Sequence, residues 1–367
     1  MNNIRVIMAI VKKDTYLIKA KPSSTVIAIF VPFVFLILFI LFALGGATVP
    51  VGMNNQDTGQ YGPVMGQALQ STNTFRSIPV QSMDEGQGLI DKQKSVATIQ
   101  IPSDFSEAVS SGDKVSMPVV IDNLNADFAD DVRRAMSLGI LNFYKQALPG
   151  TLPFTWNEVD QYPIDVGFLG YLAVSILTVA ILLGGILLTS RVVVDEFERG
   201  TIKELKLAPI PKWTILAGKI IIGFRNSLIS ALLVLGTIFL LGVRPENWFL
   251  LFCSLVLALF VFVSIGLLIG MLVRSSYAIY PLVLGVSLPL FFISGAFGPV
   301  SWSTPAISGF ARIFPVIYAN TILQSSIHGF WPLDTGIGVV WIVFAVWAVA
   351  CIAISAFIYP KIELKSN

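Results

Sequence analysis

Residues 166–189 read VGFLGYLAVSILTVAILLGGILLT, and this stretch decides the fold of the chain. None of its residues is charged, and it is too long to be a strand of a soluble core. A helix of about 20 apolar residues crosses the hydrocarbon core of a bilayer, where lipid offers no hydrogen-bond partner to open backbone groups. The stretch therefore predicts a transmembrane helix.

The rest of the chain repeats this pattern. Of its 367 residues, 55% are hydrophobic and 13% are charged, and the mean hydropathy is +0.78. About a quarter of the residues of a soluble protein are charged, so this composition excludes a water-soluble globular protein. A net charge of +2 gives no indication of a nucleic acid partner. We predict a polytopic α-helical membrane protein with six transmembrane helices, over residues 24–47, 166–189, 214–242, 249–273, 277–294 and 336–359.

Residues 1–23 precede the first predicted span. Their apolar and basic side chains separate onto two helical faces: Ile4, Ile7, Met8, Val11 and Ile18 on one, and Arg5, Lys12 and Lys19 on the other. This pattern favours an interfacial helix with its bases beside anionic lipid headgroups. The alternative is an ordinary basic flank that only sets orientation. The following apolar run is longer than the ~7–15 residues typical of a signal peptide, so we interpret it as an uncleaved anchor.

Basic residues in the short connections predict the orientation in the cell (plasma) membrane. Most of them gather on one side: Arg5, Lys12, Lys13, Lys19, Lys21, Arg191, Arg199, Lys203, Lys206, Lys212, Arg274, Lys361 and Lys365. Arg244 and Arg312 lie in the short connections of the opposite side. Both termini, including the tail 360–367, are therefore expected in the cytoplasm, and residues 48–165 outside the cell.

Residues 48–165 carry 14 acidic and 7 basic residues and are predicted to form a small extracytoplasmic α/β domain. Ser82 and Glu85 form a capping box that opens a helix over 83–93. The expected elements that follow are a strand over 96–101, a short helix between Ser103 and Gly112, a strand over 115–121 and a helix from Asn125 to about Leu148. The apolar stripe of that last helix comprises Phe128, Val132, Ala135, Ile140 and Phe143. A further strand over 75–80 is more weakly indicated.

The cytoplasmic connection 190–213 contains the most specific sequence, VDEFERGTIKELKLAP over 194–209. Gly200 permits a sharp turn, Thr201 and Glu204 predict a capping box, and Pro209 ends the second helix. The expected product is a rigid, charged helical hairpin. Such a hairpin is either moved by a cytosolic partner or is a well-capped connector, and the residues alone leave both interpretations open.

Four motifs, in this order, resemble those of ABC type-2 transporter permeases, the membrane subunits of ATP-binding cassette exporters. They are Glu198, Gly200, Thr201, Glu204 and Leu205 followed by Pro209; Gly218-Lys219; Ser294-Gly-Ala-Phe-Gly-Pro299; and Pro315-Val-Ile-Tyr-Ala319. The outside domain, with Ile101-Pro-Ser-Asp-Phe-Ser106, is similar to the long-ectodomain branch. The resemblance covers nearly the whole chain.

The resemblance implies that residues 190–213 are a coupling hairpin. In that family the matching positions, Glu198, Gly200, Thr201, Glu204 and Leu205, seat in a separate ATPase subunit, which the amino-terminal helix also touches. Two permease chains, identical or different, would work with two ATPase chains, and the ATPase would bind ATP and Mg. This chain would then hold no cofactor and would not by itself be an enzyme.

The resemblance also implies that residues 295–335 are re-entrant helices that dip into the outer leaflet. Four prolines support broken helix here, namely Pro299, Pro305, Pro315 and Pro332. Non-helical backbone at membrane depth is tolerated only where protein or a cavity receives it. The alternative is an external loop with two helices on the membrane surface.

Two cations lie within the predicted third span, where charge is costly and often functional. Lys219 is close enough to the cytoplasmic end to snorkel, whereas Arg225 lies deeper and is a candidate for contact with a buried partner or substrate. A candidate substrate path combines Arg225 with residues of the second and fifth spans: Phe168, Leu172, Phe291 and Phe292. Its expected substrate is amphipathic: a drug, a lipid or a peptide-like molecule.

Missing motifs narrow the function further. The sequence contains no G-x-x-x-x-G-K-[ST] phosphate loop, because Gly218-Lys219 is followed by Ile220. With His328 as its one histidine and no zinc spacing, it predicts no metal site. No carboxylate lies within the predicted spans, which argues against proton coupling and disfavours an intramembrane enzyme. We expect an exporter permease powered by a separate ATPase; the alternative is a non-transporting membrane receptor or scaffold that acts through its outside domain.

Overall fold

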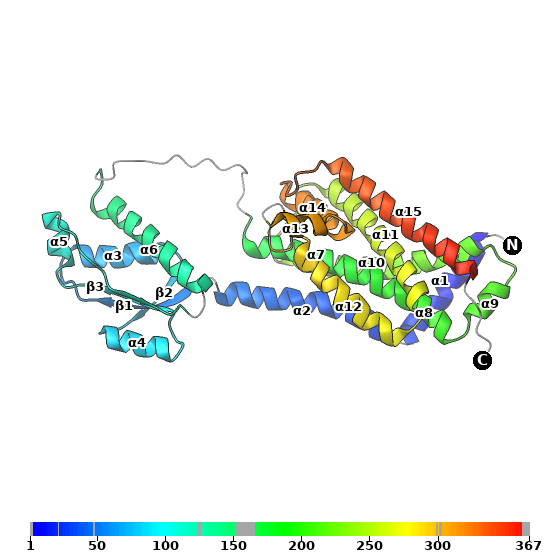
Figure 1. Cartoon of the computed structure of the whole chain (residues 1–367), viewed down its shortest axis with the longest axis horizontal. Helices are drawn as coiled ribbons and strands as arrows, with labels where there is room; N and C mark the ends of the chain where they lie inside the picture. Colours follow the sequence, from blue (N-terminus) through cyan, green and yellow to red (C-terminus); the bar gives the residue numbers. More distant parts are fainter. Residues whose placement is uncertain are drawn as a thin grey trace. The chain divides into compact units, whose positions relative to one another are not determined.

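The computed structural model describes residues 3–20, 22–46, 48–123, 126–150, 166–298, 300 and 303–361. The chain divides into a helical unit, Met1–Ile40 with Tyr162–Asn367, and an α/β unit, Leu41–Gln161 (Figure 1). Each unit has its own apolar core.

The α/β unit is built on a four-stranded sheet with the order β2-β1-β3-β4. Its strands are β1 (Val49–Asn55), β2 (Phe75–Pro79), β3 (Ala97–Ile101) and β4 (Val119–Ile121). β1 pairs in parallel with β2 and β3, while β4 is antiparallel to β3. Its helices are α3 (Tyr61–Gln70), α4 (Met83–Asp91), α5 (Phe105–Ser111) and α6 (Ala126–Ala147). Parallel strands need helical crossovers, and α3 and α6 cover one face of the sheet while α4 covers the other (Figure 1).

Several predictions for this unit are confirmed. The Ser82 hydroxyl accepts from the Glu85 amide, and the Glu85 carboxylate accepts from the Gln81 amide, so the capping box at the start of α4 forms. Gly112 ends α5 at φ 75°. The weakly indicated strand over 75–80 is present as β2, and the start of the last helix at Asn125 lies outside the described residues.

Other predictions for this unit are wrong. The N-cap of α5 is Asp104 rather than Ser103. The strand predicted over 115–121 is shorter than expected: it begins at Val119, and residues 113–118 form no strand. On α6, Phe128 and Ile140 are exposed, since the buried stripe follows Ala129, Val132, Ala135 and Phe143. The central strand β1 and helix α3 were not predicted at all.

The remaining elements belong to the helical unit, apart from the end of α2, which lies beyond Ile40. They are α1 (Asn3–Ala20), α2 (Ser23–Gly46), α7 (Phe168–Leu183), the π-helix η1 (Gly184–Leu188), α8 (Thr189–Glu198), α9 (Ile202–Leu207), α10 (Lys212–Leu240), α11 (Trp248–Val273), α12 (Ser276–Ile293), α13 (Pro305–Ala311), α14 (Pro315–His328) and α15 (Ile337–Lys361). Among the described residues, five helices are long and apolar enough to cross a membrane: α7 through α8 as one unit, α10, α11, α12 and α15. The described apolar part of α2, Thr25–Leu38, is shorter, so its span remains a prediction.

The continuous helix Leu169–Glu198 forms the centre of this unit and is buried over its apolar window. It contacts α10 and α11 so closely that side chains would not fit at the crossing points. A Cβ on Gly266 would lie 2.6 Å from the Ile186 carbonyl oxygen, and one on Gly223 would lie 2.1 Å from Thr189 Oγ1. Small residues of this kind let membrane helices approach each other. The π-helix η1 lies at this crossing, and all five of its residues are buried.

The segment predicted as re-entrant consists of α13 and α14, which meet at a bend of 92°. Such a bent pair is either one broken span or a re-entrant loop, so the helices are as expected while their place in the membrane remains a prediction. Helix α14 is buried along nearly its whole length against α7, α11 and α15. Pro299 lies outside the described residues.

Candidate coupling hairpin and its ionic cluster

The hairpin predicted over 190–213 is present as the end of α8, a turn at Gly200 and the short helix α9. Gly200 has a φ of 71°, the left-handed region that residues with a Cβ disfavour. No atom lies within 4 Å of a Cβ built there, so the backbone conformation alone requires glycine. Helix α9 ends two residues before Pro209, as predicted.

The capping box predicted for Thr201 and Glu204 does not form. Thr201 makes no side-chain cap to α9, and its hydroxyl instead donates to the carboxylate of Glu196. The hydroxyl therefore closes the hairpin back onto α8 rather than capping the next helix. The Glu204 side chain is exposed.

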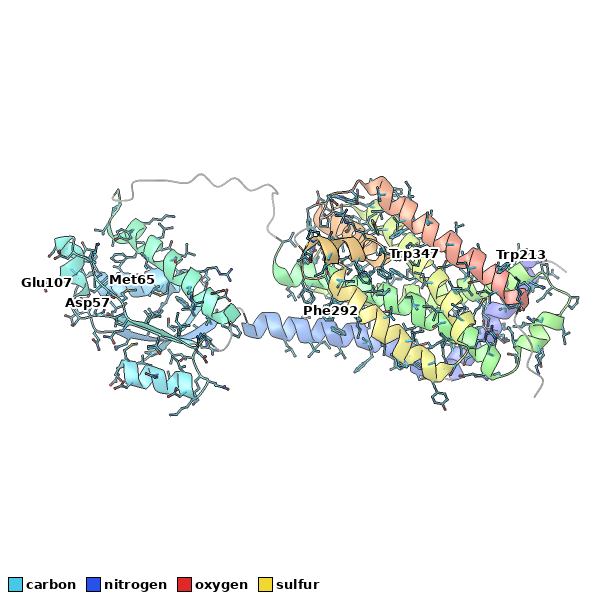
Figure 2. All side chains as sticks on the ribbon, viewed as in Figure 1. Asp57, Met65, Glu107, Trp213, Phe292 and Trp347 are labelled. Carbon is cyan, nitrogen blue, oxygen red and sulfur yellow. The ribbon has the colours of Figure 1, made fainter. Side chains whose placement is uncertain are left out.

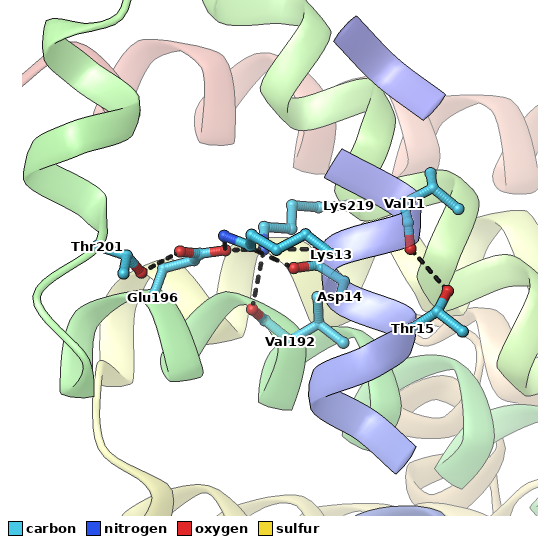
Figure 3. A network of polar contacts seen from close by, with 8 residues as sticks. All are labelled: Val11, Lys13, Asp14, Thr15, Val192, Glu196, Thr201 and Lys219. Atoms are coloured by element: carbon cyan, nitrogen blue, oxygen red, sulfur yellow. Dashed lines mark hydrogen bonds and ion pairs between the residues drawn. The ribbon is translucent and has the colours of Figure 1, made fainter. Parts of the chain in front are cut away.

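Glu196 belongs to a buried cluster that joins α1, α8 and α10 (Figure 3). The Lys219 ammonium lies 2.8 Å from Asp14 and 2.5 Å from Glu196, and it also donates to the carbonyl oxygen of Val192. Lys13 lies 2.5 Å from the same Glu196 oxygen. Two lysines thus face two carboxylates, so the cluster is balanced in charge. Buried ions are tolerated when they are paired and hydrogen-bonded in this way.

Sequence reasoning missed the acidic half of this cluster. Lys219 does not snorkel, because its side chain is only 4% exposed and its partners lie on α1 and α8. Asp14 is 2% exposed on the face of α1 that packs against α10, alongside Val6, Ile10 and Val11. A lone acid among basic and apolar residues of α1 was the available signal. Of the residues assigned to the apolar face, Ile4 and Met8 are exposed, and Met8 lines the same groove as the basic Arg5 and Lys12.

Glu198 ties the same hairpin to a different helix. Its carboxylate accepts from the backbone amide and the hydroxyl of Ser276, at 2.6 Å each, at the first residue of α12. An acceptor there satisfies a free amide of the helix N-terminus and favours its dipole. Next to it, the Arg274 guanidinium stacks 5.4 Å from the centre of the Phe197 ring. Arg191 pairs with Asp195 at 2.8 Å and reaches Glu198 at 3.5 Å.

The two sides of α9 differ. Ile202 is buried and Leu205 is half-buried in a cluster with Ile215, Met271 and Tyr359. The outer side exposes an apolar and charged set, consisting of Lys203, Glu204, Leu207 and the neighbouring Trp213. Leu207 is 80% exposed and Trp213 is 54% exposed. Trp213 is labelled in Figure 2. Of the five predicted coupling residues, Glu204 therefore lies on this outer side, whereas Leu205 packs inward.

The residues predicted for a substrate path are not brought together. Leu172 and Phe291 are fully buried, with Phe291 packed edge-to-face on Phe35 and Phe292. Phe292 is half exposed in a hollow of about 340 Å³ that Phe297 and Ile307 also line. Arg225 lines a separate groove beside α1, and the side chain of Phe168 lies outside the described residues.

A second polar cluster lies between α7 and α14, and we did not predict it from the sequence. Asn320 accepts from Thr178 and donates to the carbonyl oxygen of Gly295. Gln324 donates to Ser175 and to the carbonyl oxygen of Tyr171. These amides lie within a helix that is apolar on average, so hydropathy does not reveal them.

Comparison with known proteins identifies the family of this chain. The sequence profile described as "ABC-2 family transporter protein" matches residues 22–357. The chain belongs to this family. It is 22% identical to the probable multidrug ABC transporter permease YbhR of Escherichia coli K12 over 346 residues, covering 88% of this chain and 93% of the relative. It is 26% identical to the probable multidrug ABC transporter permease YbhS of the same organism over 345 residues, covering 88% of both chains.

A third relative is the inner membrane transport permease YhhJ of the same organism, 25% identical over 274 residues, which covers 72% of this chain and 71% of the relative. The family and the apolar helices identify the chain as a multi-pass ABC transporter permease. Permeases of this family are membrane subunits that work with an ATPase subunit. Among the described residues, no group of three or more His, Cys, Asp or Glu side chains could hold a metal ion.

Proposed function

We propose that this permease exports an amphipathic substrate with energy from ATP hydrolysed, with Mg, on a separate subunit. The hairpin 190–213 is the proposed point of coupling, through the predicted residues Glu198, Gly200, Thr201, Glu204 and Leu205. The observation that carries the proposal is the placement of two carboxylates two residues apart. Glu196 binds α1 and α10, whereas Glu198 binds the start of α12.

This arrangement favours transmission of force. Removing one partner of a buried ion pair costs about 3–5 kcal/mol, so the hairpin would not detach from α1 and α10 when pushed. A displacement of α9 would instead move α10 and α12 together. The exposed Leu207 and Trp213 are candidate anchors for the ATPase, because large apolar side chains dominate binding energy at interfaces.

The working assembly in this proposal contains two permease chains, identical or different, and two ATPase chains. Both termini and the hairpin lie in the cytoplasm, residues 48–165 lie outside, and residues 295–335 re-enter the membrane. In this proposal, the apolar part of the amphipathic substrate, a drug, lipid or peptide-like molecule, binds in a groove between α12 and α13 of about 510 Å³. Its lining is almost wholly apolar and includes Leu290, Ile293 and Phe310.

The first test is co-purification of the full chain from its native host in mild detergent. We expect an ATPase subunit to travel with the wild type and with Lys94→Glu, an exposed change in the α/β unit. Leu207→Asp combined with Trp213→Ala should lose the subunit while the permease keeps its thermal stability, since both side chains are exposed.

Retention of the ATPase by this double variant would contradict the docking assignment. Absence of any nucleotide hydrolase from the wild-type complex, together with loss of function on deletion of residues 52–160, would instead favour the receptor or scaffold alternative. That alternative places the working part in the α/β unit.

A further inference from the structure

A basic groove runs along α1 where that helix packs beside α10. It has a volume of about 560 Å³ and is lined by Arg5, Met8, Ala9, Val11, Lys12, Thr15, Tyr16, Lys19 and Arg225. Four of these residues are cations, and none of the lining residues is acidic. Arg5, Lys12 and Lys19 are spaced by seven, so they lie on one side of α1 at intervals of two turns.

The acid of α1 does not neutralise this groove. Asp14 lies on the buried side of the helix, where it binds Lys219, and Lys13 is paired with Glu196. The cations of the groove are therefore additional to the balanced cluster. Such a concentration of positive charge next to an apolar helix bundle attracts an anion.

Arg225 is held in place for such a ligand. One terminal nitrogen donates to Thr15 Oγ1 at 3.0 Å and the other to Asn226 Oδ1 at 3.2 Å. Thr15 in turn donates to the carbonyl oxygen of Val11, which orients its hydroxyl. A guanidinium has five N–H donors, so this fixed group keeps donors for the oxygens of a phosphate, which it matches in a bidentate manner.

Apolar side chains beside the cations distinguish a lipid from a soluble phosphate. Met8 and Tyr16, which line the groove together with the bases, are 59% and 63% exposed. A surface that mixes long apolar residues, tyrosine and bases suits the boundary between headgroups and acyl chains. A soluble phosphoester would leave these apolar side chains in water.

We infer that the groove between α1 and α10 binds the phosphate headgroup of an anionic phospholipid, with Arg225 and Lys12 as its contacts and Met8 and Tyr16 against the acyl chains. The inference goes beyond transport and does not rest on the ATPase assignment. In this arrangement the lipid contacts both α1 and α10, two of the three helices that the ionic cluster joins.

Native mass spectrometry of the full purified chain in detergent tests the site. Phosphatidylglycerol and phosphatidylcholine are added separately, and glycerol 3-phosphate serves as the soluble probe. We expect tighter binding of phosphatidylglycerol, weakened by salt, with no competition from equimolar glycerol 3-phosphate. Arg225→Gln and Lys12→Gln should each weaken phosphatidylglycerol binding about fivefold, the effect of one cation near an anionic headgroup.

Lys361→Gln is the matched control, because it removes one exposed cation outside the groove and should leave binding unchanged. Lys12 is exposed, so its variant keeps the test decisive even where Arg225→Gln disturbs helix packing. Equal binding of both lipids, unchanged binding by Lys12→Gln, or an equal loss in Lys361→Gln would overturn the site. Competition by equimolar glycerol 3-phosphate would show that the groove binds a soluble phosphoester rather than a phospholipid, and it would overturn the inference.

Discussion

Lys219 on α10 and Asp14 on α1 are separated by 205 residues in sequence and by 2.8 Å in the structure. The same ammonium binds Glu196 on α8, so one buried cation joins three helices. This contact and the burial of Val6 and Ile10 against Ile215 and Leu216 together hold α1 along α10. The ionic cluster also connects Glu196, at the base of the hairpin, to both α1 and α10.

Replacing Lys219 by Met should destabilise the permease by about 3–5 kcal/mol, because Asp14 and Glu196 would share only Lys13. The measurement is the free energy of unfolding of the purified chain in a denaturing-detergent titration. Lys203→Met, an exposed change on the same hairpin, should stay within about 0.5 kcal/mol of the wild type.

The double variant Lys219→Met with Asp14→Asn tests the charge argument. Removing one acid restores the balance, so the double variant should be more stable than Lys219→Met alone. Additive losses would mean that packing, rather than charge balance, decides the stability of this cluster.

Glycine at position 200 is required by its left-handed backbone, and Gly200→Ala should cost about 1–2 kcal/mol. The strain would act on the turn that orients α9. The permease variant should therefore stimulate the ATPase less than the wild type does, in addition to losing stability. Gly285→Ala is the control, since that glycine lies inside α12 with open space around it and without a positive φ. If Gly200→Ala matches this control in both measurements, the turn does not constrain the hairpin.

Sequence periodicity and turn chemistry predicted the elements whose signals are local. The capping box of Ser82, the turn at Gly200 and the helix through Leu169–Glu198 need only neighbouring residues, and all three are present. Strand β1 was not predicted from the sequence, because Val49–Asn55 follows directly on an apolar helix and contains proline and glycine. Its place at the centre of the sheet depends on pairing with distant strands.

Partners outside the local helical pattern explain the errors at the candidate site as well. Thr201 has the spacing of a cap, but a charged acceptor five residues earlier competes for its hydroxyl. The role of Lys219 could not be predicted from its own span, because its partners lie on α1 and α8. The apolar residues chosen for a substrate path matched a hydropathy pattern that buried core residues such as Leu172 and Phe291 share.

Because α11 crosses the π-helix η1 closely, one added methyl group at this crossing should lower the stability of the permease substantially. Gly266→Ala would place a Cβ 2.6 Å from the Ile186 carbonyl oxygen, and a backbone atom cannot move aside as a side chain can. We expect a loss of about 1–3 kcal/mol by overpacking, read as a lower unfolding temperature in detergent. Gly236→Ala, where nothing lies within 4 Å, should be neutral or slightly stabilising. Equal unfolding temperatures for the two variants would contradict the close approach.

In the α/β unit, Asp57 joins the end of β1 to α3 and α5. Its carboxylate accepts from the Gly62 amide at 2.8 Å and from the amide and hydroxyl of Ser106 at 3.1 and 2.6 Å. Burial alone would raise the pKa of Asp57, but these hydrogen bonds to the ionised form outweigh it and lower the pKa below the ordinary 3.8.

The sign of the pH dependence follows from this lowered pKa. The unfolded chain takes up the proton first as the pH falls, so the contribution of Asp57 is complete above pH 3.8 and is lost as the pH drops through the lower folded value. Asp57→Asn should remove about 1–3 kcal/mol of local stability at pH 7, and this loss should shrink as the pH falls below 3.8 and through the lower folded pKa. Hydrogen exchange of the Gly62 and Ser106 amides in the full chain, corrected for intrinsic rates, measures this difference. Asp91→Asn, an exposed change at the end of α4, is the control. A loss in Asp57→Asn that never shrinks as the pH is lowered below 3.8, down to acid unfolding, would contradict the assignment of the charge.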